Sequence, residues 1–394
     1  MAGAFARLRN RGHRFIAGLL IAGALALEFA SGCGGASEPT KQASGPPPQV
    51  QIVGYVAGWE PYAHIDTQNL TAVNFAFAHI EDGEAVLDRK NLDALENLRL
   101  LRINSHWLRV LISIGGWGAD GFSDAALSPE SRARFAASVA DLVQHTVVDG
   151  IDIDWEYPGL AGPGIRHRDE DRQNFPLLLI AIREALDALP PRRFLRLAND
   201  HYLITAALAD GEFVAHVDLD QVARQLDWVN LMTYDFHNSL TPTTGHHAAL
   251  SVSATSAPTE RSVERAVAQF LAAGVPAGKL IVGVPFYGRA FTGVRNENHG
   301  LDQPYSHYEG EHAWRELAAD FIDRNGYTRY WDERAGAPYL WNEKTYTFIS
   351  YDDPRSLALK AQFVRDHHLR GIMYWEQSQD RNGELLGVIA ASLR

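Results

Sequence analysis

One short segment carries the residues best suited to acid–base chemistry. It reads DGIDIDWEYPG, from Asp149 to Gly159. In a β-strand the side chains alternate between two faces, so Asp152, Asp154 and Glu156 would project to the same side. Neighbouring carboxylates raise one another's pKa, and burial adds to this effect. We therefore expect at least one of the three to hold a proton near neutral pH, as a general acid catalyst must.

Glu156 is the last acid of the row and the one best placed to reach a substrate. Two other interpretations stay open from the residues alone. Carboxylates also bind Ca²⁺ or Mg²⁺, although the spacing of a calcium-binding loop does not occur here. A purely structural role would need basic partners, and the strand itself contains no basic residue.

The surrounding sequence indicates the elements that would hold this strand. Eight short apolar runs alternate with amphipathic stretches, and they begin near residues 51, 70, 108, 148, 202, 226, 279 and 371. This rhythm predicts an α/β fold, a (β/α)8 TIM barrel, with an open doubly wound sheet as the alternative. In such a barrel the chemistry takes place at the carboxyl ends of the strands, where Glu156 would lie.

The interval between the seventh and eighth runs is unusually long. It contains about 80 residues, whereas a crossover helix needs only about a dozen. We therefore expect a small α+β insertion domain at residues 291–348, and a catalytic barrel formed by residues 50–290 and 349–394. An insertion after strand seven would form one wall of a groove beside the active site.

The first 49 residues have the pattern of an export signal. Four arginines between residues 7 and 14 precede an apolar run of about 13 residues, which is too short to span a bilayer but suits a signal peptide. We expect a signal peptide at residues 1–32 and a Gly/Ser/Pro-rich tether at 33–49. The single cysteine, Cys33, resembles the lipidated residue of a bacterial lipoprotein. The protein is expected to be exported and lipid-anchored to a bacterial membrane or cell surface, with ordinary secretion as the alternative.

The charge of the chain limits its partners. The formal net charge is −12 at pH 7. An acidic surface repels phosphate backbones and anionic lipids, so we expect a neutral substrate, no nucleic acid, and no membrane contact except through a lipid on Cys33. His237, His246 and His247 lack a zinc-binding spacing and are interpreted as loop residues rimming the cleft. We predict no metal, no cofactor and a monomer.

The acidic segment resembles the signature of a known family. DGIDIDWE matches the D-G-x-D-x-D-x-E pattern of glycoside hydrolase family 18, the chitinases. Four further segments agree in order: SIGGW at 113–117, MTYDF at 232–236, PFYGR at 285–289 and GIMYWE at 371–376. GYTRYWDE from residue 326 and FISYDDP from residue 348 resemble the segments that bracket the α+β insertion of a bacterial subfamily.

The resemblance implies an exported chitinase. Such an enzyme hydrolyses β-1,4 bonds in N-acetylglucosamine polymers and oligomers, from within or from the ends, by a retaining mechanism through an oxazolinium intermediate formed by the substrate. Chitin or N-acetylglucosamine oligosaccharides would be its partners. One alternative is a chitin-binding lectin, although lectins of this type typically lack the acid found here as Glu156. Another is a hydrolase of the N-glycan core or of peptidoglycan.

The resemblance also implies roles for individual polar residues. Glu156 would protonate the departing oxygen. Asp154 would orient the acetamido group and stabilise the oxazolinium, and Asp152 behind it would share a proton with Asp154. Tyr234 would donate its hydroxyl hydrogen to the acetamido carbonyl, while Asp235 would contact the sugar.

Aromatic side chains at the strand ends are natural platforms for the apolar faces of sugar rings. Trp375 resembles the tryptophan beneath the subsite at the cleavage point, and Trp117 resembles one that lines a neighbouring subsite. The other predicted substrate-binding residues are Tyr55, Phe77, Gly116, Met232 and Tyr287. Aromatic residues predicted to extend the groove are Trp59, Trp331, Tyr339 and Trp341.

Overall fold

The structure is a computed structural model that describes residues 50–59, 65–190, 201–257 and 259–394. The predicted signal peptide, the tether and Cys33 lie outside the described residues. Within the described ranges, none of the helices combines the length and the hydropathy needed to span a bilayer.

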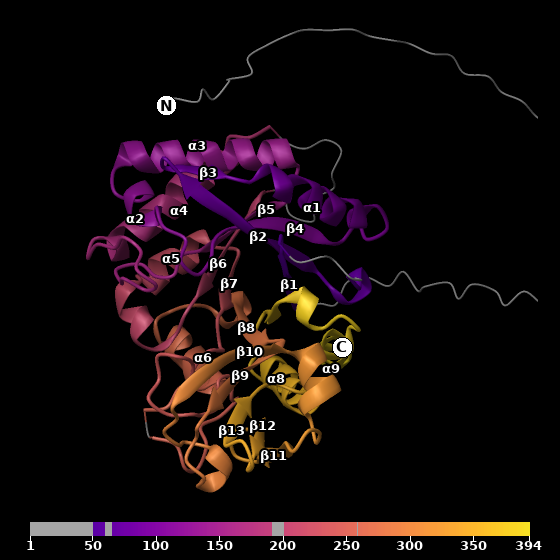
Figure 1. Cartoon of the computed structure of the whole chain (residues 1–394). Helices are drawn as coiled ribbons and strands as arrows, with labels where there is room; N and C mark the ends of the chain where they lie inside the picture. The colour runs from indigo at the N-terminus through magenta and orange to yellow at the C-terminus, as the bar shows by residue number, and fades with distance from the viewer. Residues whose placement is uncertain (1–49, 60–64, 191–200, 258) are drawn as a thin grey trace, which may run out of the picture. The chain divides into compact units, whose positions relative to one another are not determined.

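Eight parallel strands form a closed barrel (Figure 1). The first strand pairs with both the second and the last, so the sheet has no open edge. This confirms the predicted (β/α)8 barrel and excludes the open sheet. In order around the barrel the strands are β1 (Gln51–Ala57), β2 (Ala72–Glu81), β4 (Arg109–Gly115), β5 (Gly150–Asp154), β6 (Leu203–Leu208), β7 (Trp228–Leu231), β8 (Leu280–Pro285) and β14 (Gly371–Trp375). The short strand β3 (Glu84–Val86) pairs antiparallel with β2.

Helices cover the outer face of the barrel and begin at clear sequence signals. The serine hydroxyl of Ser128 caps α3, with Pro129 at the first helical position, and Asp353 caps α8 in the same way. The longer helices are α1 (Arg89–Leu100), α3 (Pro129–Thr146), α4 (Asp171–Asp187), α6 (Val263–Ala272), α8 (Pro354–Asp366) and α9 (Glu384–Leu393), and the shorter ones are α2 (Phe122–Ala125) and α5 (Leu219–Gln225).

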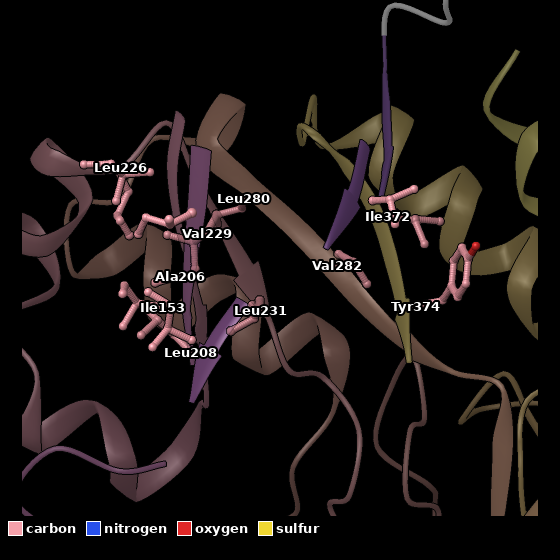
Figure 2. Packing of buried hydrophobic residues seen from close by; sticks show 14 of the residues in the cluster. Ile153, Ala206, Leu208, Leu226, Val229, Leu231, Leu280, Val282, Ile372 and Tyr374 are labelled. Atoms are coloured by element: carbon pink, nitrogen blue, oxygen red, sulfur yellow. The ribbon is translucent and has the colours of Figure 1, made fainter. Parts of the chain in front are cut away.

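Strand β5 turns its apolar side chains toward the helices. Ile151 and Ile153 are fully buried, and the ring of Trp155, just past the strand, stacks on Phe122 with 5.4 Å between centroids. Figure 2 shows Ile153 gathered with Ala206 of β6 in this layer. Because side chains alternate along a strand, this packing directs the acids of β5 into the barrel.

A second sheet lies in the chain between β8 and β14, the seventh and eighth barrel strands. It is antiparallel, with strand order β10-β9-β13-β12-β11. This is the predicted α+β insertion, and its sheet extends from Tyr287 to Ser350. Its elements are β9 (Tyr287–Thr292), β10 (His307–Ala313), α7 (Trp314–Glu316), β11 (Thr328–Asp332), β12 (Ala337–Asn342) and β13 (Thr347–Ser350).

Candidate active site

A cavity of about 990 Å³ lies at the carboxyl ends of the barrel strands. Residues of β9, β10 and α7 line it together with the barrel residues, so the insertion contributes to its wall. Tyr55 and Asp152 lie beneath the cavity and are 1% and 0% exposed. The predicted residues that line the cavity are Asp154, Glu156, Tyr234, Asp235, Phe77, Gly116, Trp117, Met232, Tyr287 and Trp375.

Asp152 is held by side chains from four other strands. Its Oδ2 accepts hydrogen bonds from Tyr55 Oη and Ser113 Oγ, both at 2.8 Å. Its Oδ1 accepts from Thr205 Oγ1 at 2.5 Å and Asn230 Nδ2 at 3.0 Å. These donors occupy all of the roughly four acceptor sites of a carboxylate. Burial raises the pKa of Asp152, the four hydrogen bonds lower it, and the net pKa lies above its usual value.

No hydrogen bond joins Asp152 to Asp154 among the described residues. Asp154 ends β5, is 5% exposed, and its Oδ1 has no hydrogen-bond partner in the described part of the chain. Burial and the charges of Glu156 and Asp152 raise its pKa. The proton-sharing role of Asp152 thus stays a prediction, whereas its negative charge already favours a proton on Asp154.

Glu156 lies two residues beyond the end of β5 and faces the cavity. The pKa of Glu156 is raised to about 7. Burial is the main cause, the charge of Asp235 adds to it, and a hydrogen bond with Tyr157 acts in the opposite direction. Within the described residues, none of the three acids of the row forms an ion pair with a basic side chain. This argues against the interpretation that they are structural acids held by basic partners.

Asp235 lies in a different electrostatic environment. It accepts hydrogen bonds from Tyr287 Oη at 2.8 Å and from Arg289 Nε and Nη2 at 2.8 and 2.6 Å. His247 Nδ1 lies 3.5 Å from its Oδ1. Desolvation alone would raise the pKa of Asp235, but His247 and the Arg289 guanidinium lower it well below its usual range. Asp235 is therefore ionised, and its neighbours hold it in place.

Tyr234 lines the cavity beside these groups. Burial and the charges of Asp154, Asp235 and Glu156 raise the pKa of Tyr234 well above its usual value. Its hydroxyl therefore keeps its hydrogen at neutral pH and is available as a donor.

Two groups of aromatic rings line the cavity. In the first, the Trp375 group, Trp375 lies 5.6 Å from Tyr55, 5.7 Å from Phe77 and 6.5 Å from Trp59, centroid to centroid. Trp59 therefore joins the site, and it is 60% exposed. The stacked Phe77 and Trp375 rings are nearly parallel, at 20°. This group offers broad apolar faces to a sugar.

The second, the Tyr157 group, consists of Trp117, Tyr157 and Phe213. Tyr157 lies 6.3 Å from Trp117 and 4.1 Å from Phe213 between ring centroids. Neither Tyr157 nor Phe213 was predicted from the sequence as a site residue. The position of Tyr157, directly after Glu156, was an available signal, whereas Phe213 lies in a short 3-10 helix after β6, Gly211–His216, which has no distinctive sequence pattern.

The structure corrects the prediction that three further aromatic residues extend the groove. Tyr339 and Trp341 are buried in the core of the insertion sheet. Trp331 packs against the guanidinium groups of Arg329 and Arg355 and does not line the cavity. Aromatic residues on an antiparallel sheet serve its own core as readily as a ligand.

The three histidines are buried and do not rim the cleft, which corrects that prediction as well. Each faces a carboxylate in place of solvent. His237 Nε2 lies 3.1 Å from Glu260, His246 Nε2 lies 3.3 Å from Asp332, and His247 contacts Asp235.

Ser113, Thr205 and Asn230 support the site from below through their hydrogen bonds to Asp152. Only Asn230 was visible, because it alternates with Met232 and Tyr234 along one strand face. A polar residue at an inward position of a barrel strand is the signal that would have found Ser113 and Thr205.

Comparison with known proteins agrees with this geometry. Residues 51–380 match the family model described as glycosyl hydrolases family 18. Chitinase A1 of Niallia circulans is 33% identical over 412 residues, which cover 87% of this chain and 58% of that protein. Chitinase B of Serratia marcescens is 30% identical over 397 residues, which cover 82% of this chain and 76% of that protein. The chain thus spans little more than half the length of chitinase A1.

Solved structures show the same fold. A glycoside hydrolase family 18 N-acetylglucosaminidase from Paenibacillus barengoltzii superimposes with a TM-score of 0.80 at 37% identity, covering 87% of this chain and 100% of that one. Chitinase ChiW from Paenibacillus sp. gives a TM-score of 0.80 at 38% identity, covering 88% of this chain but only 33% of that one.

Proposed function

The chain belongs to glycosyl hydrolase family 18, and from this premise we propose that it is a chitinase that hydrolyses β-1,4 bonds between N-acetylglucosamine units. One observation carries the proposal. Glu156 faces the cavity as the last of a row of three acids, and its pKa is raised to about 7. It has no basic partner in the described residues. A carboxylic acid that keeps its proton near neutrality can protonate a glycosidic oxygen.

In the first step we assign the nucleophile to the substrate. The carbonyl oxygen of the 2-acetamido group attacks C1 of its own sugar, and the bond from C1 to the glycosidic oxygen breaks. The electron pair of that bond stays on the leaving oxygen, which takes the proton of Glu156. The product on the enzyme is a cyclic oxazolinium ion.

Two neighbouring residues would stabilise this step. The oxazolinium keeps its N–H and gains a positive charge. An ionised Asp154 would accept a hydrogen bond from that N–H and offset the positive charge. For Asp154 to be ionised in this step, the proton that its raised pKa favours passes to Asp152, which is the proton-sharing role that the family resemblance implies for Asp152. Tyr234, whose raised pKa keeps its hydrogen in place, would hold the acetamido oxygen in line with C1.

The second step reverses the roles. Glu156, now a carboxylate, takes a proton from water, and the water oxygen attacks C1 from the face that the leaving group vacated. The ring opens, the amide is restored, and the product keeps the original anomeric configuration. The rings of the Trp375 group would support the sugar throughout.

The test uses defined N-acetylglucosamine oligomers. We expect hydrolysis with retention of the anomeric configuration. NMR of the freshly released anomers measures this. Glu156→Gln should lose at least about 10³-fold in rate, within the range for a general acid, while oligosaccharide binding persists. Glu343→Gln, an exposed glutamate of the insertion, is the matched control. Turnover retained by Glu156→Gln, or inversion of the anomer, would overturn the assignment.

We also propose that the protein is exported and carries a lipid on Cys33. The order of arginines, apolar run, small residues, cysteine and polar tract supports this. Cys33→Ser should move the protein from the membrane fraction to the soluble fraction. Unchanged fractionation would contradict the lipid anchor.

A further inference from the structure

Glu212 lines the cavity but has no part in the mechanism above. It lies in the 3-10 helix Gly211–His216 that follows β6, directly before Phe213 of the Tyr157 group. Its side chain is exposed to the cavity. Among the described residues it forms no ion pair and no hydrogen bond. It is therefore an available negative charge on the wall of a sugar-binding groove.

The arginines of the cavity wall already have carboxylate partners. Each arginine of the described lining is paired with a carboxylate: Arg261 with Asp210, Arg289 with Asp235 and Glu311, and Arg315 with Glu316. The described lining contains no lysine. Glu212 is thus an exposed acid of the lining, outside the catalytic row, with which no cation of the described residues forms an ion pair.

The position of Glu212 relative to Glu156 indicates which sugar it would meet. Tyr157 follows Glu156 directly and contacts Phe213, whereas in the described residues no ring contact joins the Tyr157 group to the Trp375 group. If the reacting sugar lies over Trp375 beside Asp154, the departing part of the chain lies along the Tyr157 group. Glu212 would then face the departing part.

We propose that Glu212 selects glucosamine units on the leaving-group side of the cut, so that partially deacetylated chitin is a preferred substrate. This inference rests on the proposed function. Removal of the acetyl group leaves an amine that takes up a proton, and an ammonium group is the natural partner of an unpaired carboxylate. The reacting sugar itself must keep its acetyl group, because that group is the nucleophile. Cleavage is therefore expected between an acetylated unit and a following deacetylated unit.

The test measures the new chain ends. Partially deacetylated chitin is digested at low ionic strength and at a pH at which its amines are protonated, and NMR gives the fraction of glucosamine at the newly formed non-reducing ends. We expect an enrichment of about two- to fivefold over the bulk fraction, the size typical of an exposed ion pair. Added salt should reduce the enrichment, because the screening length falls to about 8 Å at physiological ionic strength.

Variants distinguish Glu212 from the general acidity of the protein. Glu212→Gln should bring the enrichment back to the bulk fraction, and Glu212→Lys should disfavour glucosamine at these ends. Glu343→Gln removes the same charge from outside the cavity and should keep the wild-type enrichment.

Three results would contradict either the role of Glu212 or the proposed function. No enrichment in the wild type, or an enrichment that Glu212→Gln leaves unchanged, overturns the role of Glu212 while the chitinase function stands. Failure to cleave fully acetylated oligomers overturns the proposed function itself, and this inference with it.

Discussion

Asp154 and Glu156, at and just beyond the end of β5, and Asp235, which follows β7, face the same cavity but hold their protons differently. Asp154 and Glu156 have raised pKa values, in both cases chiefly because of burial. Desolvation acts in the same direction on Asp235, yet its pKa lies well below the usual range. The difference is that His247 and Arg289 contact Asp235, Arg289 through two nitrogens, whereas Asp154 and Glu156 have no cation among their described neighbours.

This contrast separates two uses of a carboxyl group in one site. Without a cation, desolvation keeps the proton on the acid, which can then be given to a leaving group. With a guanidinium, the acid stays ionised and serves as a fixed anchor. The partners of the acid, here His247 and Arg289, decide between a proton donor and a permanent charge more than its depth in the cavity does.

The largest test of the contrast is Asp154→Asn. An amide cannot provide the negative charge that we assign to Asp154 in the oxazolinium state, so kcat should fall by about 10²–10³-fold, as for loss of one preorganised electrostatic partner. The loss of a neighbouring carboxylate also removes a cause of the raised pKa of the pair. The alkaline limb of the pH–rate profile should therefore move to lower pH.

An unchanged alkaline limb in Asp154→Asn would show that the two acids of β5 do not titrate together. Glu343→Gln controls for a general change in net charge. Because the readout is a shift of the limb, a variant that is merely less stable cannot imitate the predicted result.

Arg289→Met tests the other side of the contrast. Without the guanidinium, only His247 still offsets the desolvation of Asp235, so the pKa of Asp235 should rise toward the usual value. We expect a loss of about 2 kcal/mol in the free energy of unfolding, below the range of about 3–5 kcal/mol for fully buried pairs, since the Asp235 side chain is 31% exposed. Denaturant unfolding at several pH values measures this.

The sign of the pH dependence follows from the lowered pKa. An acid with a depressed pKa in the folded state stabilises the protein above its unfolded pKa, and this stabilisation is lost as the pH falls. The deficit of Arg289→Met should therefore be largest near neutral pH and shrink below about pH 4, near the ordinary value of 3.8 for aspartate. A deficit that does not vary with pH would mean that Arg289 acts only through packing.

The two halves of the contrast were not equally visible in the sequence. Alternation along DGIDIDWE is a local property, and it predicted which acids share a face before any fold was known. The pairing of Asp235 with Arg289 joins residues 54 positions apart, from the segment after β7 and from the insertion. No local pattern encodes such a contact, so the opposite pKa shifts could not be anticipated.

Aromatic residues show the same limit. Trp375 and Tyr339 are equally good platforms by residue type, yet one lines the cavity and the other fills the core of the insertion sheet. The fold was predictable because eight apolar runs repeat along the chain, whereas the function of a single ring depends on which neighbours the tertiary structure brings to it.

Glu156→Gln also tests the contrast through the stability of the folded protein, independently of the reaction rate. Glutamine stays neutral, so the variant avoids the cost of ionising a desolvated carboxyl. The wild type should lose stability as the pH rises from about 4.5, the ordinary value for glutamate, to about 7, its raised value in the folded state. Relative to the wild type, the variant should gain roughly 3 kcal/mol across this window, measured by thermal unfolding. The opposite trend, or none, would contradict the raised pKa of Glu156.

The smallest effect is expected at Glu311, the second carboxylate of Arg289. Arg289 Nη1 lies 2.8 Å from Glu311 Oε1, but this side chain is 44% exposed and accounts for only one of the guanidinium contacts. Glu311→Gln should therefore cost at most about 1 kcal/mol in unfolding free energy, as for other solvent-screened pairs. Asp235 would keep both of its bonds to Arg289, so the acid limb of the stability profile should stay where it is in the wild type. If Glu311→Gln moved that limb as far as Arg289→Met does, then Glu311 would be fixing the arginine in place, and the contrast would depend on the insertion as a whole and not on one guanidinium.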